Sequence, residues 1–221
     1  MSLILHGYWR SSAAYRVRIA LNLKGLDYDQ VTYDLRQGAQ GGPAYRAVNP
    51  RGLVPALEVD DVVLTQSPAI LEWLEDRYAE PPLLPQRLAD RAVVRAMVAI
   101  IACDIHPLNN LRVLQQLRNQ FTADADAERQ WAAGWITSGF QALEGMIHRY
   151  GRGFSFSDHP TLADCCLVPQ VYSAARFGVD MTPFPSIRGT VAALNSLPAV
   201  ADAHPDNQPD ADRQDPDDRD A

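Results

Sequence analysis

The sequence predicts an α/β domain followed by an all-α domain, and three features of the chain indicate this division. Over the first eighty residues, short apolar runs alternate with helical segments, the pattern of strands that alternate with helices. The run PPLLP at 81–85 then interrupts this pattern. The later segments all have helical periodicity. We therefore expect an α/β domain over 1–80 and an all-helical domain over 87–202.

The α/β domain is expected to open with a β-α-β unit. Residues 3–6 read as a strand, residues 15–24 as a helix, and residues 28–35 as a second strand. Gly25 is a natural stop for the helix. Such a unit has parallel strands joined by a right-handed crossover.

The start of the first helix has an unusual composition. A strand that runs into a helix is where thioredoxin-like folds keep a Cys-x-x-Cys pair, but here the chain has Ser11, Ser12, Ala13 and Ala14. These residues cannot perform disulfide chemistry. Taken alone, the two serines are typical helix caps.

A hairpin and a helix are expected to complete this domain. The segments at 53–59 and 62–65 alternate like two strands around a turn at Asp60-Asp61. Pro55 is anomalous inside a strand, and a cis Val54-Pro55 bond would explain it, leaving the backbone of Val54 able to pair with an extended ligand. Gln66 and Ser67 then open a helix, with Ser67 as its N-cap.

The all-helical domain is expected to contain four main helices. They cover 88–119, with a possible kink at Pro107, then 126–150, a run opened by Thr161-x-x-Asp164, and 185–197. Thr161 and Asp164 form a variant of the capping box.

Composition and charge restrict the possible partners and location. Of the net charge of −7, −6 lies in the last twenty residues, and residues 203–221 read as an acidic, disordered, solubilising tail. No basic stripe supports nucleic-acid binding, and no apolar run is long enough to span a membrane, so we expect a cytoplasmic protein. Cys103, Cys165 and Cys166 lack metal-binding spacing and are interpreted as buried free thiols, and we expect no metal site.

Two helix N-termini, at Ser11 and Ser67, are expected at the same end of the sheet as Val54. Helix N-termini favour anions, and a thiol near Ser11 would have its pKa lowered there. The pattern therefore fits a thiol cofactor that is bound as a peptide.

Several segments carry a resemblance to a known family. The motifs RSSAAYRVRIAL, NPRGLVPAL, QSPAILEWLE, CDIHPLNNLRVL and PTLADCCLVPQVYSAARFGVD resemble the zeta class of glutathione transferases, and within it the maleylacetoacetate and maleylpyruvate isomerases. The resemblance runs from residue 1 to about 210. It implies a thioredoxin-like N-terminal domain, an all-helical C-terminal domain and a homodimer. At position 13 this chain has Ala where many relatives have Cys.

The resemblance also implies roles for individual residues. Ser11 would hydrogen-bond the glutathione sulfur, with Ser12 beside it in the pocket. The remaining glutathione contacts would come from Gln40, Val54, Pro55, Gln66, Ser67, His106 and Asn110. Arg176 would bind a substrate carboxylate, with Arg10 and Arg112 as helpers.

The implied function is glutathione-dependent cis-trans isomerisation of maleylacetoacetate to fumarylacetoacetate, a step in tyrosine and phenylalanine breakdown. Three alternatives stay open: isomerisation of maleylpyruvate in the gentisate route, a broader transferase or dehalogenase activity, and a non-catalytic glutathione-binding module. Tyr8 is an alternative to Ser11 as the thiolate partner, because other glutathione transferase classes use a tyrosine near this position.

Overall fold

The computed structural model describes residues 2–212, which form two compact units. The first unit combines residues 2–74 with residues 198–212, and the second contains residues 75–197. No helix within 2–212 has both the length and the apolar character needed to cross a bilayer.

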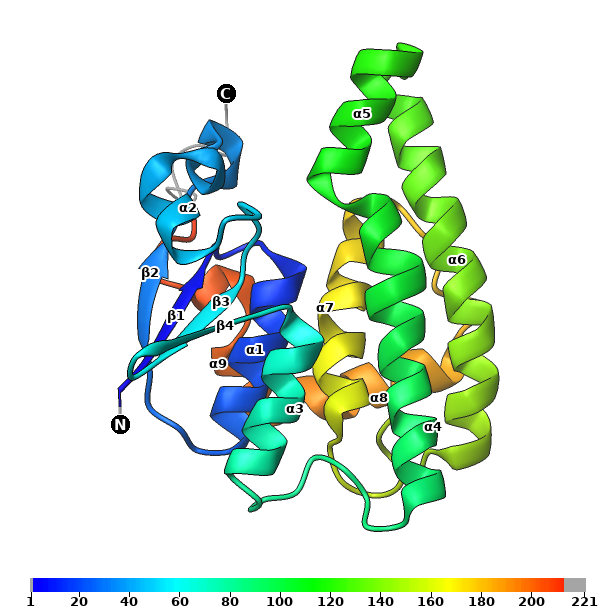
Figure 1. Cartoon of the computed structure of the whole chain (residues 1–221). Helices are drawn as coiled ribbons and strands as arrows, with labels where there is room; N and C mark the ends of the chain where they lie inside the picture. Colours follow the sequence, from blue (N-terminus) through cyan, green and yellow to red (C-terminus); the bar gives the residue numbers. More distant parts are fainter. Residues whose placement is uncertain (1, 213–221) are drawn as a thin grey trace, which may run out of the picture. The chain divides into compact units, whose positions relative to one another are not determined.

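A four-stranded mixed sheet organises the first unit (Figure 1). Its strands, in the spatial order β2-β1-β3-β4, are β1 (Leu3–Gly7), β2 (Asp29–Thr32), β3 (Ala56–Val59) and β4 (Val62–Thr65). Strand β1 pairs in parallel with β2 and antiparallel with β3, and β3 pairs antiparallel with β4. The expected β-α-β unit and the hairpin are therefore confirmed.

Helices α1 (Ser12–Leu23) and α3 (Ser67–Arg77) lie together on one face of this sheet (Figure 1). Between β2 and β3 the chain forms two 3₁₀ turns, η1 (Leu35–Gln37) and η2 (Ala39–Gly41), and the short helix α2 (Pro43–Val48). Most of α1 is buried, since ten of its residues, Ser12 to Leu21, are shielded from solvent.

The second unit is entirely helical. Its main helices are α4 (Leu88–Ala99), α5 (Leu111–Phe121), α6 (Ala125–Tyr150), α7 (Leu162–Arg176) and α8 (Pro185–Asn195). The predicted helices over 126–150 and 185–197 are confirmed to within a few residues. The capping box is confirmed as well, because Asp164 accepts a hydrogen bond from the backbone N–H of Thr161 at 2.7 Å.

The single helix expected over 88–119 is wrong. After α4 the chain continues as a π-helical turn, η3 (Ile100–Ile105), and a 3₁₀ turn, η4 (His106–Asn109). Asn110 then adopts an extended conformation with φ −69° and ψ 145°, which separates α5 from the preceding turns. Pro107 explains the break, since proline lacks the N–H that an uninterrupted helix needs at that position.

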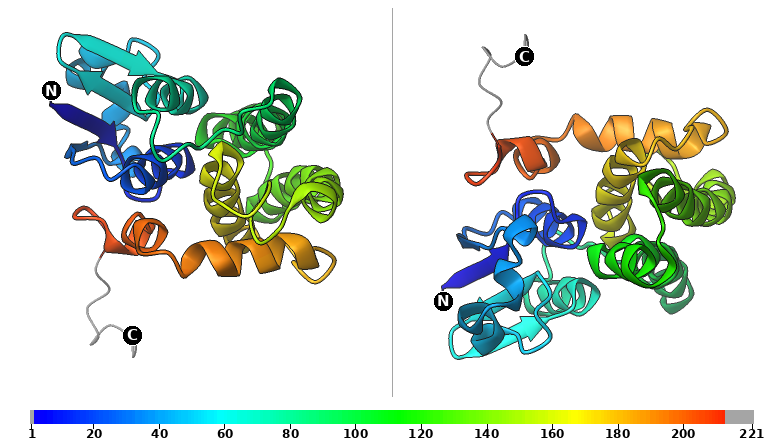
Figure 2. Two further views of the ribbon diagram at one scale, coloured as in Figure 1. Left: turned by 90° about the horizontal axis from the view of Figure 1, so that it is seen from below. Right: turned by 90° about the horizontal axis from the view of Figure 1, so that it is seen from above.

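The disordered tail expected from residue 203 is wrong for residues 203–212. Helix α9 (Pro198–Asp202) and the 3₁₀ turn η5 (Pro205–Asn207) belong to the first unit, where α9 lies beside α1 (Figure 2). Asn22 of α1 donates a hydrogen bond to the carbonyl oxygen of Ala199 at 2.9 Å. The rest of the predicted tail, 213–221, lies outside the described residues.

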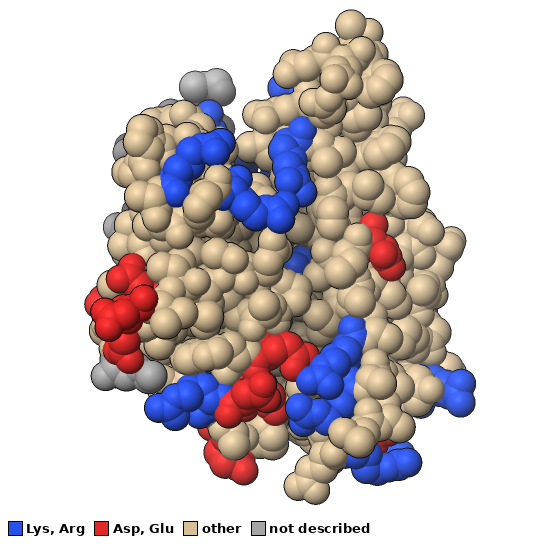
Figure 3. All heavy atoms as spheres, viewed as in Figure 1, with Lys and Arg blue, Asp and Glu red and all other residues tan. Residues whose placement is uncertain are grey.

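The three cysteines differ in their exposure. Cys165 and Cys166 are fully buried and belong to no disulfide among residues 2–212, as expected. Cys103 is also a free thiol but is exposed, so the expectation that it is buried is wrong. On the face drawn in Figure 3, several basic side chains gather in the upper part of the view, and acidic side chains lie in smaller groups below them.

Candidate functional site

Ser11 is the N-cap of helix α1, with φ −70° and ψ 114°. Its Oγ accepts a hydrogen bond from the backbone N–H of Ala14 at 3.2 Å, and its own N–H donates to the carbonyl oxygen of Tyr8 at 3.0 Å. A hydroxyl that accepts in this way can still donate its own hydrogen. Ser11 is therefore both a cap and a candidate donor to an anion. Ser12, the first residue of the helix, is buried and 8% exposed.

A buried positive charge from α1 lies against the N-terminus of helix α3. Ser67 is 4% exposed, and its Oγ accepts a hydrogen bond from Nη1 of Arg16 at 3.2 Å. Arg16 lies on α1 and is only 1% exposed. Its guanidinium group therefore adds to the positive ends of two neighbouring helix dipoles, an arrangement that favours a carboxylate.

Gln66 is the N-cap residue of α3, a role that was expected for Ser67. The carbonyl oxygen of Gln66 accepts the first helical hydrogen bond of α3, from the N–H of Ile70 at 3.0 Å, so the helix begins one residue earlier than expected. Gln66 is exposed and has a φ of 68°, in the left-handed region that non-glycine residues seldom adopt. Strained backbone of this kind is common at ligand sites.

The peptide bond between Val54 and Pro55 is cis, as expected. The main chain of Val54 lies outside the strands and takes part in no hydrogen bond within residues 2–212. The preceding carbonyl, that of Leu53, accepts two hydrogen bonds of 2.7 Å, from Oη of Tyr45 and from Nδ2 of Asn49. The main-chain groups of Val54 are therefore available to a ligand, and its pairing with an extended ligand stays a prediction.

Gln40 is held next to this segment. Gly52 has a φ of 62°, and a Cβ atom there would lie 2.8 Å from the carbonyl oxygen of Gln40, so only glycine fits. Oε1 of Gln40 is buried, and no hydrogen-bond partner for it occurs among the residues described. A buried carbonyl oxygen of this kind can accept a hydrogen bond from a ligand N–H.

Tyr8 and Arg10 flank the cap residue. Burial raises the pKa of Tyr8 above its ordinary value, which keeps its phenol protonated. Arg10 stacks on Trp9, with 5.5 Å between its guanidinium carbon and the ring centre. A neutral phenol can donate a hydrogen bond, but it does not supply a negative charge.

The other four predicted site residues belong to the second unit. His106 begins η4, Asn110 caps α5 by accepting from the N–H of Arg112 at 3.2 Å, and Arg112 itself is exposed. Arg176 is exposed in the last turn of α7, with its guanidinium carbon 5.9 Å from the ring centre of Phe177. The capping bond of Asn110 is a structural role that sequence analysis did not foresee.

Sequence analysis missed the three residues that support the first unit's site: Arg16, Tyr45 and Asn49. Arg16 lies among apolar neighbours in the segment AAYRVRIAL, which is expected to be helical. A charged residue inside an apolar helix is seldom buried without a partner, and this was the available signal. Tyr45 and Asn49 lie in a short helical stretch and gave no comparable signal.

Comparisons with known proteins identify the family to which this chain is similar. The glutathione S-transferase N-terminal domain family matches residues 10–77. A maleylpyruvate isomerase of Ralstonia sp is 50% identical over 210 residues, which are 94% of this chain and 99% of that protein. The maleylacetoacetate isomerase of Pseudomonas aeruginosa is 48% identical over 209 residues, 93% of this chain and 97% of that protein.

Solved structures give the same result. The holo structure of a maleylpyruvate isomerase, described as a bacterial zeta-class glutathione transferase, matches with a TM-score of 0.93 at 48% identity and covers 94% of this chain and 99% of that one. A maleylacetoacetate isomerase of Anaeromyxobacter dehalogenans, with dicarboxyethyl glutathione and citrate bound in its active site, has a TM-score of 0.86 at 44% identity, covering 96% and 98%. The chain therefore belongs to the zeta-class glutathione transferases, in the group of maleylacetoacetate and maleylpyruvate isomerases.

Proposed function

We propose that the protein is a glutathione-dependent cis-trans isomerase that converts maleylacetoacetate to fumarylacetoacetate. The observation that carries this proposal is the state of Ser11 at the N-terminus of α1. Its oxygen already accepts the capping hydrogen bond from Ala14, so its hydrogen can be donated to an anionic sulfur. The similarity to isomerases over nearly the whole chain supports the choice of reaction.

The residues of the first unit fit glutathione. The unpaired main chain of Val54 would pair with the cysteinyl backbone, and the buried Oε1 of Gln40 would accept from an N–H at the glycyl end. Gln66 and Ser67 would bind the γ-glutamyl carboxylate above the buried guanidinium of Arg16. Each of these groups has the polarity that its proposed partner needs.

Residues of the second unit would complete the cofactor contacts. We assign His106 and Asn110 to the glycyl or cysteinyl end of glutathione. Asn110 keeps its amide N–H groups for this purpose, because the capping bond uses only its oxygen.

Bound glutathione supplies a thiolate that adds to the conjugated double bond of the substrate, allows rotation about the resulting single bond, and leaves again. Ser11 and the positive end of α1 stabilise negative charge on the sulfur, which lowers the pKa of the thiol. Arg176, helped by Arg10 and Arg112, binds the two carboxylates of the substrate, for which guanidinium groups offer paired N–H donors. Donors and cations of this kind also stabilise the charge that develops on an enolate oxygen.

Maleylpyruvate is the second candidate substrate. A relative at 50% identity over 94% of this chain is a maleylpyruvate isomerase, slightly more similar than the maleylacetoacetate isomerase at 48% over 93% of this chain. Both substrates are cis-enedioates that need the same thiolate and the same guanidinium groups. We further propose that the enzyme acts in the cytoplasm as a homodimer, which rests on family resemblance.

A paired assay tests the proposal. The purified protein is incubated with maleylacetoacetate and with maleylpyruvate, each with and without glutathione, and kcat/KM is measured for both. We expect activity only with glutathione and a higher kcat/KM on maleylacetoacetate. Equal or higher kcat/KM on maleylpyruvate would reverse the order of the two substrates.

Calorimetric titration with glutathione separates an enzyme from other members of the fold. Binding together with activity supports the proposal. Absence of binding at millimolar glutathione contradicts it, and binding without turnover of either substrate indicates a non-catalytic binding module.

A further inference from the structure

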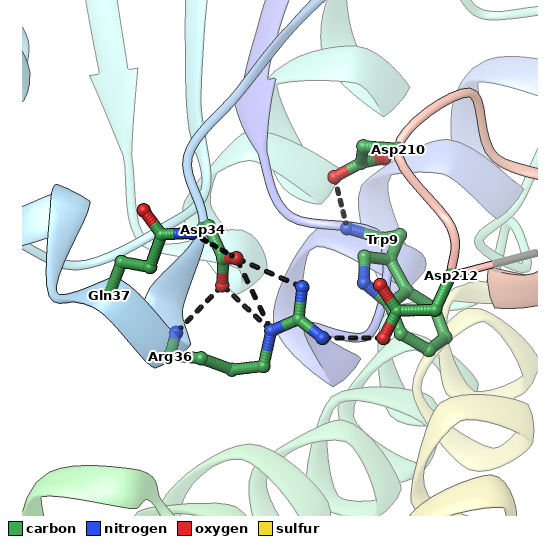
Figure 4. Close-up of polar contacts among 6 residues, drawn as sticks. All are labelled: Trp9, Asp34, Arg36, Gln37, Asp210 and Asp212. Carbon is green, nitrogen blue, oxygen red and sulfur yellow. Dashed lines mark hydrogen bonds and ion pairs between the residues drawn. The ribbon is translucent and has the colours of Figure 1, made fainter.

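The main chain of Trp9, two residues before Ser11, is held by Asp210 of the C-terminal segment and by Arg18 of α1, which belong to the same unit. The backbone N–H of Trp9 donates to Oδ2 of Asp210 at 3.0 Å (Figure 4). The carbonyl oxygen of Trp9 accepts from Nη2 of Arg18 at 2.9 Å, and Nε of the same arginine donates to the carbonyl oxygen of Ala203 at 3.0 Å. The two peptide groups that flank Trp9 are therefore held, one directly by Asp210 and the other by Arg18, which Ala203 in turn anchors.

The two contacts of Arg18 are shielded from solvent, and the contact of Asp210 is half-buried. Trp9 is 8% exposed, Arg18 is 1% exposed and Ala203 is fully buried. A hydrogen bond from a buried N–H to a carboxylate is stronger than one to a neutral acceptor, and its loss leaves a buried donor unpaired. The segment is thus firmly attached where it meets the Ser11 loop.

A second anchor lies beside the first. Nη1 of Arg36 donates to Asp212 at 2.5 Å, and the same guanidinium pairs with Asp34 (Figure 4). The hydrogen bonds from Arg36 hold the pKa of the Asp34 carboxyl below its ordinary value. This anchor is exposed, and exposed ion pairs contribute little to stability. The half-buried contact of Asp210 with the buried main chain of Trp9 is therefore the one that positions the loop.

We propose that Asp210 is a positioning residue for catalysis, whose carboxylate holds the Trp9 peptide so that the Tyr8–Ser11 turn presents the Ser11 hydroxyl to the thiol. The proposal rests on the role assigned to Ser11 above. The link between the two residues is short: Asp210 holds the N–H of Trp9, and the N–H of Ser11 closes the turn onto the carbonyl of Tyr8 at 3.0 Å.

The hydrogen bond, rather than the negative charge, carries this role. Oδ1 of Asp210, the other carboxylate oxygen, is buried, and no hydrogen-bond partner for it occurs in the part of the chain that the structure describes. A negative charge near the thiol would oppose the thiolate. An asparagine at this position would keep one acceptor oxygen and remove the charge, so it separates the two contributions.

The experiment compares Asp210→Ala, Asp210→Asn and the matched control Asp206→Asn in the full-length protein. Asp206 lies in the same segment and is exposed, and its carboxylate lies 3.7 Å from Nδ1 of His204. For each variant we would measure kcat, KM for glutathione, the thiol pKa of bound glutathione from thiolate absorbance, and peptide-resolved hydrogen exchange over residues 8–11 without ligand.

We expect Asp210→Ala to lower kcat by about ten- to a hundredfold, the range for a catalytic group displaced by about 1 Å. The thiol pKa should rise and exchange over 8–11 should accelerate, while KM for glutathione changes less than about threefold, because the groups that bind the peptide are untouched. Asp210→Asn should stay within about threefold of the wild type on all measures, and Asp206→Asn should match the wild type.

Unchanged thiol pKa, kcat and exchange in Asp210→Ala would overturn the proposal, as would an Asp210→Asn variant as impaired as Asp210→Ala. A purely structural role would lower the melting temperature of Asp210→Ala and leave its thiol pKa and kcat per folded molecule unchanged, which also contradicts it. Failure of this proposal can be distinguished from failure of the proposed function. The proposed function is tested by the activity of the wild-type protein, whereas hydrogen exchange over residues 8–11 is measured without glutathione binding or turnover.

Discussion

Helices α1 and α7 both begin at a capped N-terminus, but the two caps use their polar groups differently. Asp164 of α7 is fully buried, and its two oxygens accept from the N–H groups of Thr161 and Ser155 and from the Thr161 hydroxyl, at 2.7 to 2.8 Å. Ser11 of α1 is half-buried and uses only its acceptor. A fully satisfied buried cap stabilises the fold, whereas a partly used cap at the surface retains a group for a ligand.

Ser11→Ala is expected to have the largest effect on catalysis. We predict a fall in kcat of about 10- to 10³-fold, the scale of losing one donor to a developing anion. Loss of the cap should destabilise the fold by only about 1 kcal/mol. Steady-state kinetics and urea unfolding would be measured together. A Ser11→Ala variant with unchanged kcat would contradict the role of Ser11 in catalysis. It would mean that Ser11, like Asp164, serves only as a helix cap.

Asp164→Ala is expected to show the opposite pattern. Removing the carboxylate leaves buried donors on Ser155 and Thr161, so the free energy of unfolding should fall by about 3 kcal/mol. Per folded molecule, kcat should not change. Asp180→Ala is the matched control, because Asp180 accepts from the N–H of Thr182 at an exposed turn and should matter by less than about 0.5 kcal/mol.

Gly52→Ala extends the comparison to the loop that supports the site. The new Cβ would lie 2.8 Å from the carbonyl oxygen of Gln40 in a left-handed backbone, so we expect a loss of about 2 kcal/mol in stability and a higher KM for glutathione. Gly38→Ala is the control, with a φ of 72° and no atom within 4 Å of its Cβ. Gly38→Ala should lose only the stability that a left-handed backbone takes from a residue with a Cβ atom. Equal KM values for glutathione in the two variants would count against a role of Gln40.

Tyr8→Phe should have the smallest effect. Burial raises the pKa of the Tyr8 phenol, so the group stays protonated and neutral through neutral pH. We predict kcat within about threefold of the wild type and an unchanged pH profile of kcat/KM. A severe loss of kcat in Tyr8→Phe, together with an unchanged kcat in Ser11→Ala, would make Tyr8 rather than Ser11 the residue that stabilises the glutathione thiolate.

Local patterns in the sequence predicted much of the fold. The hairpin at 56–65, the cis bond before Pro55 and the capping box of Asp164 each follow from residues close together in the chain. Contacts between distant residues were not predictable in this way. The acidic composition of 203–212 indicates disorder, but Ala203 and Gln208 are buried because α1 and β2 offer them partners some 180 residues earlier in the chain.

The candidate site shows the same limit. Ser11, Val54 and Ser67 could be named from short motifs and the family resemblance. Arg16 could not, because its importance depends on a contact with Ser67 across 51 positions of sequence. The break before α5 was also missed, since Pro107 was compatible with a kinked helix as well as with the extended Asn110 that the structure contains.

The first unit is discontinuous in sequence, since residues 198–212 complete a packing that residues 2–74 begin. During synthesis on the ribosome, the side of α1 that packs against α9 therefore stays uncovered until about 120 further residues have been added. Closing so long a loop slows folding, because its entropy must be lost before the contacts form. A fragment cut after the sheet would expose the buried guanidinium of Arg18 without the carbonyl of Ala203, so the apparent N-terminal domain should be poorly suited to expression on its own.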